Sequence, residues 1–136
     1  MTAHLFRLSE TRRKRVAYAL TACVAAAILV LALVPLPAAP SVPGSDKTHH
    51  FIAFAALVCP VALIYPRALW WALPLAVSEA GLIEIVQPYV NRMREWADFT
   101  AGVKGALAGA AAGLALHYAA RATTTKTVSD RSEKRL

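Results

Sequence analysis

Residues 16–34 read VAYALTACVAAAILVLALV and carry no charged side chain over nineteen positions. An α-helix rises about 1.5 Å per residue, so a run of this length crosses the roughly 30 Å hydrocarbon core of a bilayer. Four basic residues, 12–15, stand directly before it. The run therefore predicts a membrane-spanning helix, and it decides the class of the protein.

A cleaved signal peptide is the alternative interpretation of the first run. The run is longer than the apolar region of a signal peptide, which is about 7 to 15 residues. Prolines at 35, 37 and 40 also surround the Ala-x-Ala-like site, which argues against cleavage.

Three further apolar runs follow, at 48–65, 69–87 and 98–120. The second contains Pro60 and the third Pro74, which membrane helices tolerate where neighbouring helices satisfy the freed backbone groups. The polar stretch that follows the last run has no hydrophobic periodicity and predicts disorder. We expect an all-α fold, a polytopic membrane protein with a bundle of four transmembrane helices. Its predicted parts are a basic cytoplasmic tail over 1–15, a membrane domain over 16–120 and a disordered cytoplasmic tail over 121–136.

The composition agrees with a membrane protein. Hydrophobic residues make up 57% of the 136 residues, charged residues 17%, and the mean hydropathy is +0.46. The formal net charge is +7, but the cations flank the apolar runs and do not alternate with aromatic residues, so no nucleic-acid partner is expected. Cys23 and Cys59 lie inside apolar runs, and two cysteines exclude a disulfide framework.

Lysine and arginine are distributed unequally between the two sides of the predicted bundle. The two tails and the Arg67 loop hold 11 of them, whereas the opposite loops hold Lys47, Arg92 and Arg94. Loops that remain in the cytoplasm carry the excess of positive charge. We therefore expect both termini in the cytoplasm and the loops 36–47 and 88–97 outside.

Polar residues gather on the outer side of the last three runs. Ionisable side chains inside membrane helices are unfavourable, so they mark functional positions by default. His50 and Glu84 each lie about one turn inside a predicted helix end. We expect a shallow ligand-binding pocket, open to the outside, in which Arg92 pairs with Glu84. Its predicted residues are Asp46, Lys47, His50, Glu84, Gln87, Arg92 and Asp98.

Several of these residues also have a purely structural interpretation. Asp46 and Asp98 can cap helices, and Lys47 can extend to the interface. His49 and His50 diverge by about 100° on a helix and cannot hold one metal ion together. A zinc site would require Glu84 and Asp98 beside His50, and a hydrogen-bonded structural histidine is the simpler interpretation. We therefore predict no metal ion and no cofactor.

Two features lie outside this pocket. Gly105, Gly109 and Gly113 recur at every fourth position and predict a close helix contact, which a homo-oligomer could also use. Glu79 and Lys104 lie deeper than the pocket, at similar depths on the third and fourth runs. We expect these two charges to contact each other beside the seam of the two helices.

Four short motifs follow one another on the last three runs: Asp46-Lys47-x-x-His50-Phe51-x-x-Phe54, Glu84-x-x-Gln87, Arg92-x-x-x-Trp96-x-Asp98 and Gly105-x-x-x-Gly109. In order and spacing they resemble the pattern of VanZ-like membrane proteins, over residues 46–113. This chain has Gly102 where the family often has an asparagine four residues after the aspartate. The resemblance implies a bacterial cell-envelope protein of the inner (cytoplasmic) membrane, linked to glycopeptide and especially teicoplanin resistance. It does not supply a molecular activity.

Three functions fit these observations. The leading hypothesis is a membrane protein, not demonstrably an enzyme, that contacts membrane lipids and binds a lipid-linked cell-wall precursor or a glycopeptide at the polar cluster. The second is an outer-leaflet enzyme in which Glu84 and Asp98 divide acid and base work, aided by His50. The third is a small oligomeric ion channel or transporter with Glu79, Glu84 and Lys104 as an ion relay.

Overall fold

The computed structural model describes residues 9–33 and 46–133, with side chains described as far as residue 123. Within these ranges the chain forms four long helices and two short 3-10 helices, and it holds no strand. The all-α fold and the number of long helices are therefore confirmed. In chain order the elements are α2 (Glu10–Leu33), α3 (Asp46–Ile64), η1 (Pro66–Ala68), α4 (Leu69–Val86), η2 (Gln87–Val90) and α5 (Trp96–Glu133).

All four long helices are long and apolar enough to cross a membrane, which makes the chain a multi-pass membrane protein. The third candidate span includes both 3-10 helices and covers Pro66–Val90. The first helix begins at Glu10, so residues 12–15 form its first turns, whereas we expected them in a tail before the helix. Lysine and arginine are good helix formers and are compatible with this extension.

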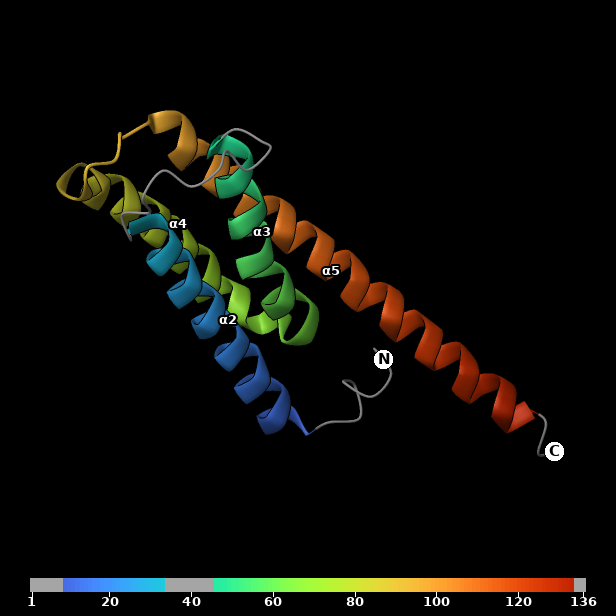
Figure 1. Ribbon diagram of the computed structural model, residues 1–136. Helices are drawn as coiled ribbons and strands as arrows, with labels where there is room; N and C mark the ends of the chain where they lie inside the picture. The colour runs from blue at the N-terminus through green and yellow to red at the C-terminus, as the bar shows by residue number, and fades with distance from the viewer. Residues whose placement is uncertain (1–8, 34–45, 134–136) are drawn as a thin grey trace.

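The last helix also extends beyond its predicted end at residue 120. The backbone of α5 is helical to Glu133, where we expected a disordered tail from residue 121. Adding a residue to an existing helix gains one hydrogen bond for one residue fixed, so a polar segment can continue a helix that a membrane span has nucleated. Figure 1 shows this part of α5 projecting past the other helices. The expectations for residues 1–8, 34–45 and 134–136 lie outside the described residues.

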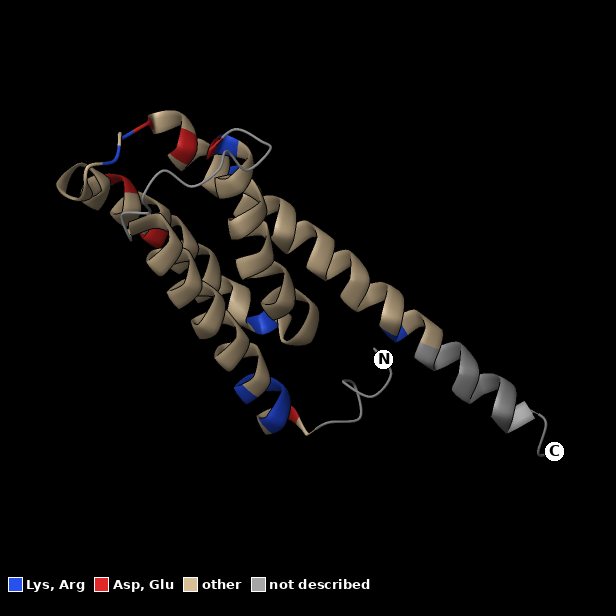
Figure 2. Cartoon of the chain, in the orientation of Figure 1, with Lys and Arg blue, Asp and Glu red and all other residues tan. Residues whose placement is uncertain are grey.

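Successive helices run in opposite directions (Figure 1). The ends of α2 and α4 therefore lie at the same end of the bundle as the beginnings of α3 and α5. We call this the site end. At the opposite end, the basic end, lie residues 12–15, Arg67 and Arg121, drawn in blue in Figure 2. The unequal distribution of cations along the sequence is thus also a difference between the two ends of the bundle.

The helices α3 and α5 pack backbone against backbone along a seam of three glycines. A Cβ atom added at any of them would overlap a carbonyl oxygen of α3: that of Phe51 for Gly105, of Ala55 for Gly109 and of Cys59 for Gly113. The predicted close contact is thus confirmed, because it needs residues without side chains. The seam also bears on the surface that we expected a homo-oligomer to use. Since α3 of the same chain covers this glycine face, the face is not open to a second copy.

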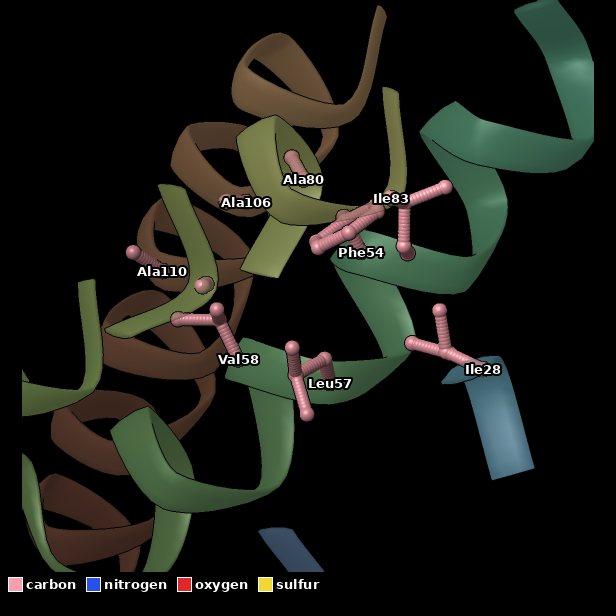
Figure 3. Packing of buried hydrophobic residues seen from close by; sticks show 9 residues of the cluster. Ile28, Phe54, Leu57, Val58, Ala80, Ile83, Ala106 and Ala110 are labelled. Atoms are coloured by element: carbon pink, nitrogen blue, oxygen red, sulfur yellow. The ribbon is translucent and has the colours of Figure 1, made fainter. Parts of the chain in front are cut away.

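A cluster of buried apolar side chains lies beneath the site end (Figure 3). Its largest member, Phe54 of α3, is fully buried and lies beside Ile83 and Ala80 of α4. In lipid, such clusters stabilise a bundle through close packing more than through removal of apolar surface from water. The packing of Phe54 fixes the position of the α3 turn that begins the site.

Candidate functional site

Three ionisable side chains from three different helices meet at the site end. His50 comes from the first turns of α3, Glu84 from the end of α4 and Asp98 from the first turn of α5. One ligand atom of each lies within 4.8 Å of the ligand atoms of the other two. Glu84 and Asp98 are 3% and 4% exposed, and His50 is half-buried. The three side chains therefore lie together, as the sequence predicted. We call these three residues the triad.

The triad contains carboxylate oxygens without a hydrogen-bond partner. Oε1 of Glu84 and Oδ1 of Asp98 are buried and accept no hydrogen bond from the described residues. The same is true of Oε1 of Gln87, which is 2% exposed and lies one turn beyond Glu84. Buried polar atoms are nearly always paired, and those that are not call for an explanation. The site end is thus rich in acceptors and short of donors.

The surrounding residues hold the triad in place. The backbone N–H of Glu95 donates to Oε2 of Glu84 at 2.9 Å. The ring of Phe54 stacks on that of His50, with centroids 6.4 Å apart and planes inclined by 15°. These contacts fix the orientation of two of the three side chains, while Oε1 of Glu84 stays unpaired.

Gly102 makes room for the aromatic ring behind His50. A Cβ atom at this position would lie 3.0 Å from Cδ2 and 3.2 Å from Cε2 of Phe54. Both distances are tighter than ordinary packing, so any side chain at 102 displaces the ring. The absence of a side chain at Gly102 is therefore matched by the position of the Phe54 ring.

Arg92 does not belong to the cluster in which we expected it. Its Nη1 atom donates to the carbonyl oxygens of Leu31 and Ala32, in the last turn of α2, at 3.3 and 3.2 Å. No ion pair joins it to Glu84 within the described part of the chain. Carbonyl groups at a helix C-terminus lack partners inside the helix and attract a cation, which explains the contact.

The other predicted residues lie at the rim of the site. Nζ of Lys47 lies 2.9 Å from Oε2 of Glu95, and both side chains are about half exposed. Asp46 is exposed and lies 3.9 Å from Nδ1 of His49, one turn further along α3. Lys47 and Asp46 thus lie near the triad without entering it. Glu95 links the two parts through its backbone N–H and its carboxylate, and it was not among the predicted site residues.

A groove of about 440 Å³ runs beside the triad, between the first turns of α3 and α5. Both of its basic side chains, Lys47 and Lys104, are exposed. Apolar surface from Phe51, Ala97 and Ala101 forms much of the wall between them. The complete lining is Lys47, Thr48, Phe51, Ala97, Thr100, Ala101 and Lys104.

The predicted contact between Glu79 and Lys104 is wrong. Lys104 points into the groove between α3 and α5, whereas Glu79 is buried on α4 and its Oε1 atom has no partner among the described residues. No ion pair joins the two side chains in the described part of the chain.

The basic end holds a second hollow, of about 360 Å³, which the sequence did not indicate. His117 is buried there, and its Nδ1 atom donates to the carbonyl oxygen of Leu63 at 2.7 Å. Arg13 donates to the carbonyl oxygen of Ile64 through Nε at 3.1 Å and Nη2 at 2.8 Å. A histidine within the second half of an apolar run was the available signal for this region. Its two best-defined contacts cap the C-terminus of α3 and indicate a structural role.

The chemistry of the site end follows from its donors and acceptors. Two unpaired buried carboxylates and an imidazole can bind a cation, accept hydrogen bonds from hydroxyl or amine groups, or transfer protons. The adjacent groove pairs lysines with apolar surface, as an anionic amphiphile requires. No protein-family model, no curated protein and no solved structure matches the chain.

Proposed function

We propose that this chain is a VanZ-like membrane protein of the bacterial cell envelope that binds an amphiphile at the site end of its bundle. In this proposal it lies in the cytoplasmic membrane, with both termini in the cytoplasm and the site end facing out. The concentration of arginine and lysine at the basic end supports that orientation. The order and spacing of the motifs between Asp46 and Gly113 support the family.

The groove between α3 and α5 is the observation that carries the proposal. Lys47 and Lys104 present two ammonium groups along a wall of apolar surface, and Lys104 has no ion-pair partner among the described residues. A lysine in a membrane helix is unfavourable unless it reaches water, a headgroup or an anion. An amphiphile whose phosphate contacts the lysines and whose chain follows Phe51 satisfies both parts of this groove.

The adjacent acceptors favour a headgroup rich in hydrogen-bond donors. Oxygens of Glu84, Asp98 and Gln87 accept from hydroxyl, amide or amine groups. A lipid-linked cell-wall precursor combines phosphate, sugar hydroxyls and peptide amides, and a glycopeptide of the teicoplanin type combines an acyl chain with sugars and amides. Both belong to the proposed ligand class, and glycopeptide resistance is the proposed physiological setting.

Mass spectrometry of molecules retained by the detergent-purified protein tests this proposal. We expect the wild type to retain a phosphate-bearing amphiphile, and Lys104→Gln to retain several-fold less. Arg94→Gln is the matched control, because Arg94 is also a cation at the site end but lies over the Trp96 ring, 4.9 Å from its centroid. Equal retention by all three proteins, or retention of bulk phospholipid alone, contradicts the proposal.

An outer-leaflet enzyme is the second candidate, and the triad favours it. Carboxyl groups of Glu84 and Asp98 lie close enough to act on one bound group, with His50 beside them. Turnover of a lipid-linked saccharide by the purified protein, abolished by Glu84→Gln and by Asp98→Asn, would support catalysis. Binding of the same substrate without turnover would leave the binding function alone.

A further inference from the structure

The triad has the composition and the geometry of a metal site. His50, Glu84 and Asp98 offer one nitrogen and two carboxylate oxygens, all within 4.8 Å of one another. They come from α3, α4 and α5, so the site exists only when the three helices are assembled. This set of donors is typical of zinc and other first-row divalent ions, whereas calcium and magnesium prefer oxygen ligands alone.

The burial of the carboxylates is a second, independent indication. Glu84 and Asp98 are only 3% and 4% exposed. Each has a carboxylate oxygen without a hydrogen-bond partner among the described residues. The nearby cations do not meet these oxygens, since Arg92 binds α2 and Lys47 binds Glu95. Two buried negative charges without compensation are strongly destabilising. One divalent cation balances both charges.

Contrary to our expectation from the sequence, we propose that His50, Glu84 and Asp98 bind a divalent transition-metal ion, with zinc as the reference ion. Donor atoms around tetrahedral zinc, each about 2.0–2.2 Å from the metal, lie about 3.4 Å apart. The separations between the three donors, at most 4.8 Å, therefore shorten by up to about 1.4 Å around the ion. Three protein ligands leave a fourth position open, and the unpaired Oε1 of Gln87 is the nearest candidate along the chain.

The surroundings of the triad fit the proposal. Metal ligands are usually held by hydrogen bonds and packing from a second layer of residues. Here the N–H of Glu95 holds Oε2 of Glu84, which directs the unpaired Oε1 as the ligand atom. Phe54, packed against Gly102, fixes the plane of the His50 ring. The inference goes beyond the binding of an amphiphile in the lysine groove and does not depend on it, although an ion at the triad would occupy the oxygens of Glu84 and Asp98 that the proposed headgroup would otherwise contact.

Zinc titration of the intact, tag-free protein in detergent, after removal of metal with a chelator, tests the inference. We expect one zinc ion per chain and a rise in the melting temperature on binding. His50→Ala, Glu84→Gln and Asp98→Asn should each weaken binding by more than about 100-fold, because even loss of a supporting residue weakens metal binding about 10- to 100-fold.

Two matched variants serve as controls. Glu79→Gln removes another buried carboxylate of α4 that also lacks a partner at Oε1 but lies outside the triad. His49→Ala removes the neighbouring, exposed histidine. Both should bind zinc as the wild type does. Absence of stoichiometric binding by the wild type, or equal loss in Glu79→Gln and Glu84→Gln, overturns the proposal.

X-ray absorption spectroscopy of zinc bound to the wild type identifies the ligand atoms directly. It therefore tests the inference even if a variant fails to fold. We expect one imidazole nitrogen, with oxygen as the other protein donor and no sulfur. A sulfur ligand would assign the metal to Cys23 or Cys59. A spectrum without imidazole would show that His50 is not a ligand and would overturn the proposal.

Discussion

The guanidinium Nη1 atom of Arg92 lies 3.2 Å from the carbonyl oxygen of Ala32. This hydrogen bond joins the segment between η2 and α5 to the last turn of α2, and it places a positive charge at the negative end of the helix dipole. Arg13 makes the equivalent contact with Ile64 at the end of α3. At each end of the bundle, an arginine from another helix or loop therefore closes a helix C-terminus.

Replacing Arg92 by glutamine should lower the free energy of unfolding by about 1 to 2 kcal/mol, because two charge-assisted hydrogen bonds to α2 are lost. Thermal unfolding in detergent, followed by circular dichroism, measures the change. Arg94→Gln removes a cation of the same segment that contacts Trp96, and it should have a much smaller effect. The double variant Arg92→Gln, Glu84→Gln should be additive within about 0.5 kcal/mol, because the two side chains share no contact. Strong coupling would instead show that Arg92 pairs with Glu84.

Gly109→Ala should separate α3 from α5 and lower the free energy of unfolding by about 2 kcal/mol or more, because the new methyl group overlaps the backbone of Ala55. Gly81→Ala is the matched control. A Cβ at Gly81 meets Phe99 Cε2 at 3.8 Å, an ordinary contact, and alanine is the better helix former. This second variant should be neutral or more stable than the wild type. Equal melting temperatures of the two variants would refute the backbone contact.

Gly102→Ala should displace the Phe54 ring and so disturb the His50 side chain on which it stacks. We expect a loss of about 1 kcal/mol in stability together with weaker zinc binding. Phe54→Leu removes the ring atoms that the new methyl group meets, so Gly102→Ala should have a smaller effect on that background. A double-variant cycle on both readouts measures the coupling. No coupling would show that Gly102 acts independently of Phe54.

The orientation can be tested with single cysteines on a background in which Cys23 and Cys59 are replaced by alanine. Met93 is 82% exposed at the site end, and Thr123 is exposed at the other end of the α5 span. An impermeant thiol reagent should label Met93→Cys in intact cells and Thr123→Cys only after the membrane is opened. The reverse pattern would place the site end in the cytoplasm.

The helices could be predicted from the sequence because predominantly apolar runs of membrane length have few alternatives to a membrane-spanning helix. The four runs beginning at Val16, Thr48, Leu69 and Asp98 are all helical. Their ends could not be predicted as well, since helices continue into polar sequence without a hydrophobic signal, as α5 does as far as Glu133. The basic residues before Val16 are helical for the same reason.

The triad could be predicted because each of its members lies near one end of an apolar run, and these three ends lie on the same side of the bundle. Depth along a helix follows directly from residue number. The partners of Arg92 and Lys104 depend on how the helices are arranged around one another, which depth does not specify. Arg92 donates to carbonyl groups in the last turn of α2. Lys104 lines the groove between α3 and α5, whereas Glu79 is buried on α4. The sequence showed that Gly102 departs from the pattern of VanZ-like proteins. Only the structure shows that a side chain at this position would meet the ring of Phe54.

The glycine seam has a mechanical consequence for the site. Because α3 and α5 are in backbone contact along three successive turns, sliding or tilting would make carbonyl groups collide, and we expect the two helices to move as a unit. His50 and Asp98 are both carried by that unit, whereas Glu84 is carried by α4. If the bundle opens at this end, we therefore expect Glu84 to move away from His50 and Asp98 while the distance between those two changes little.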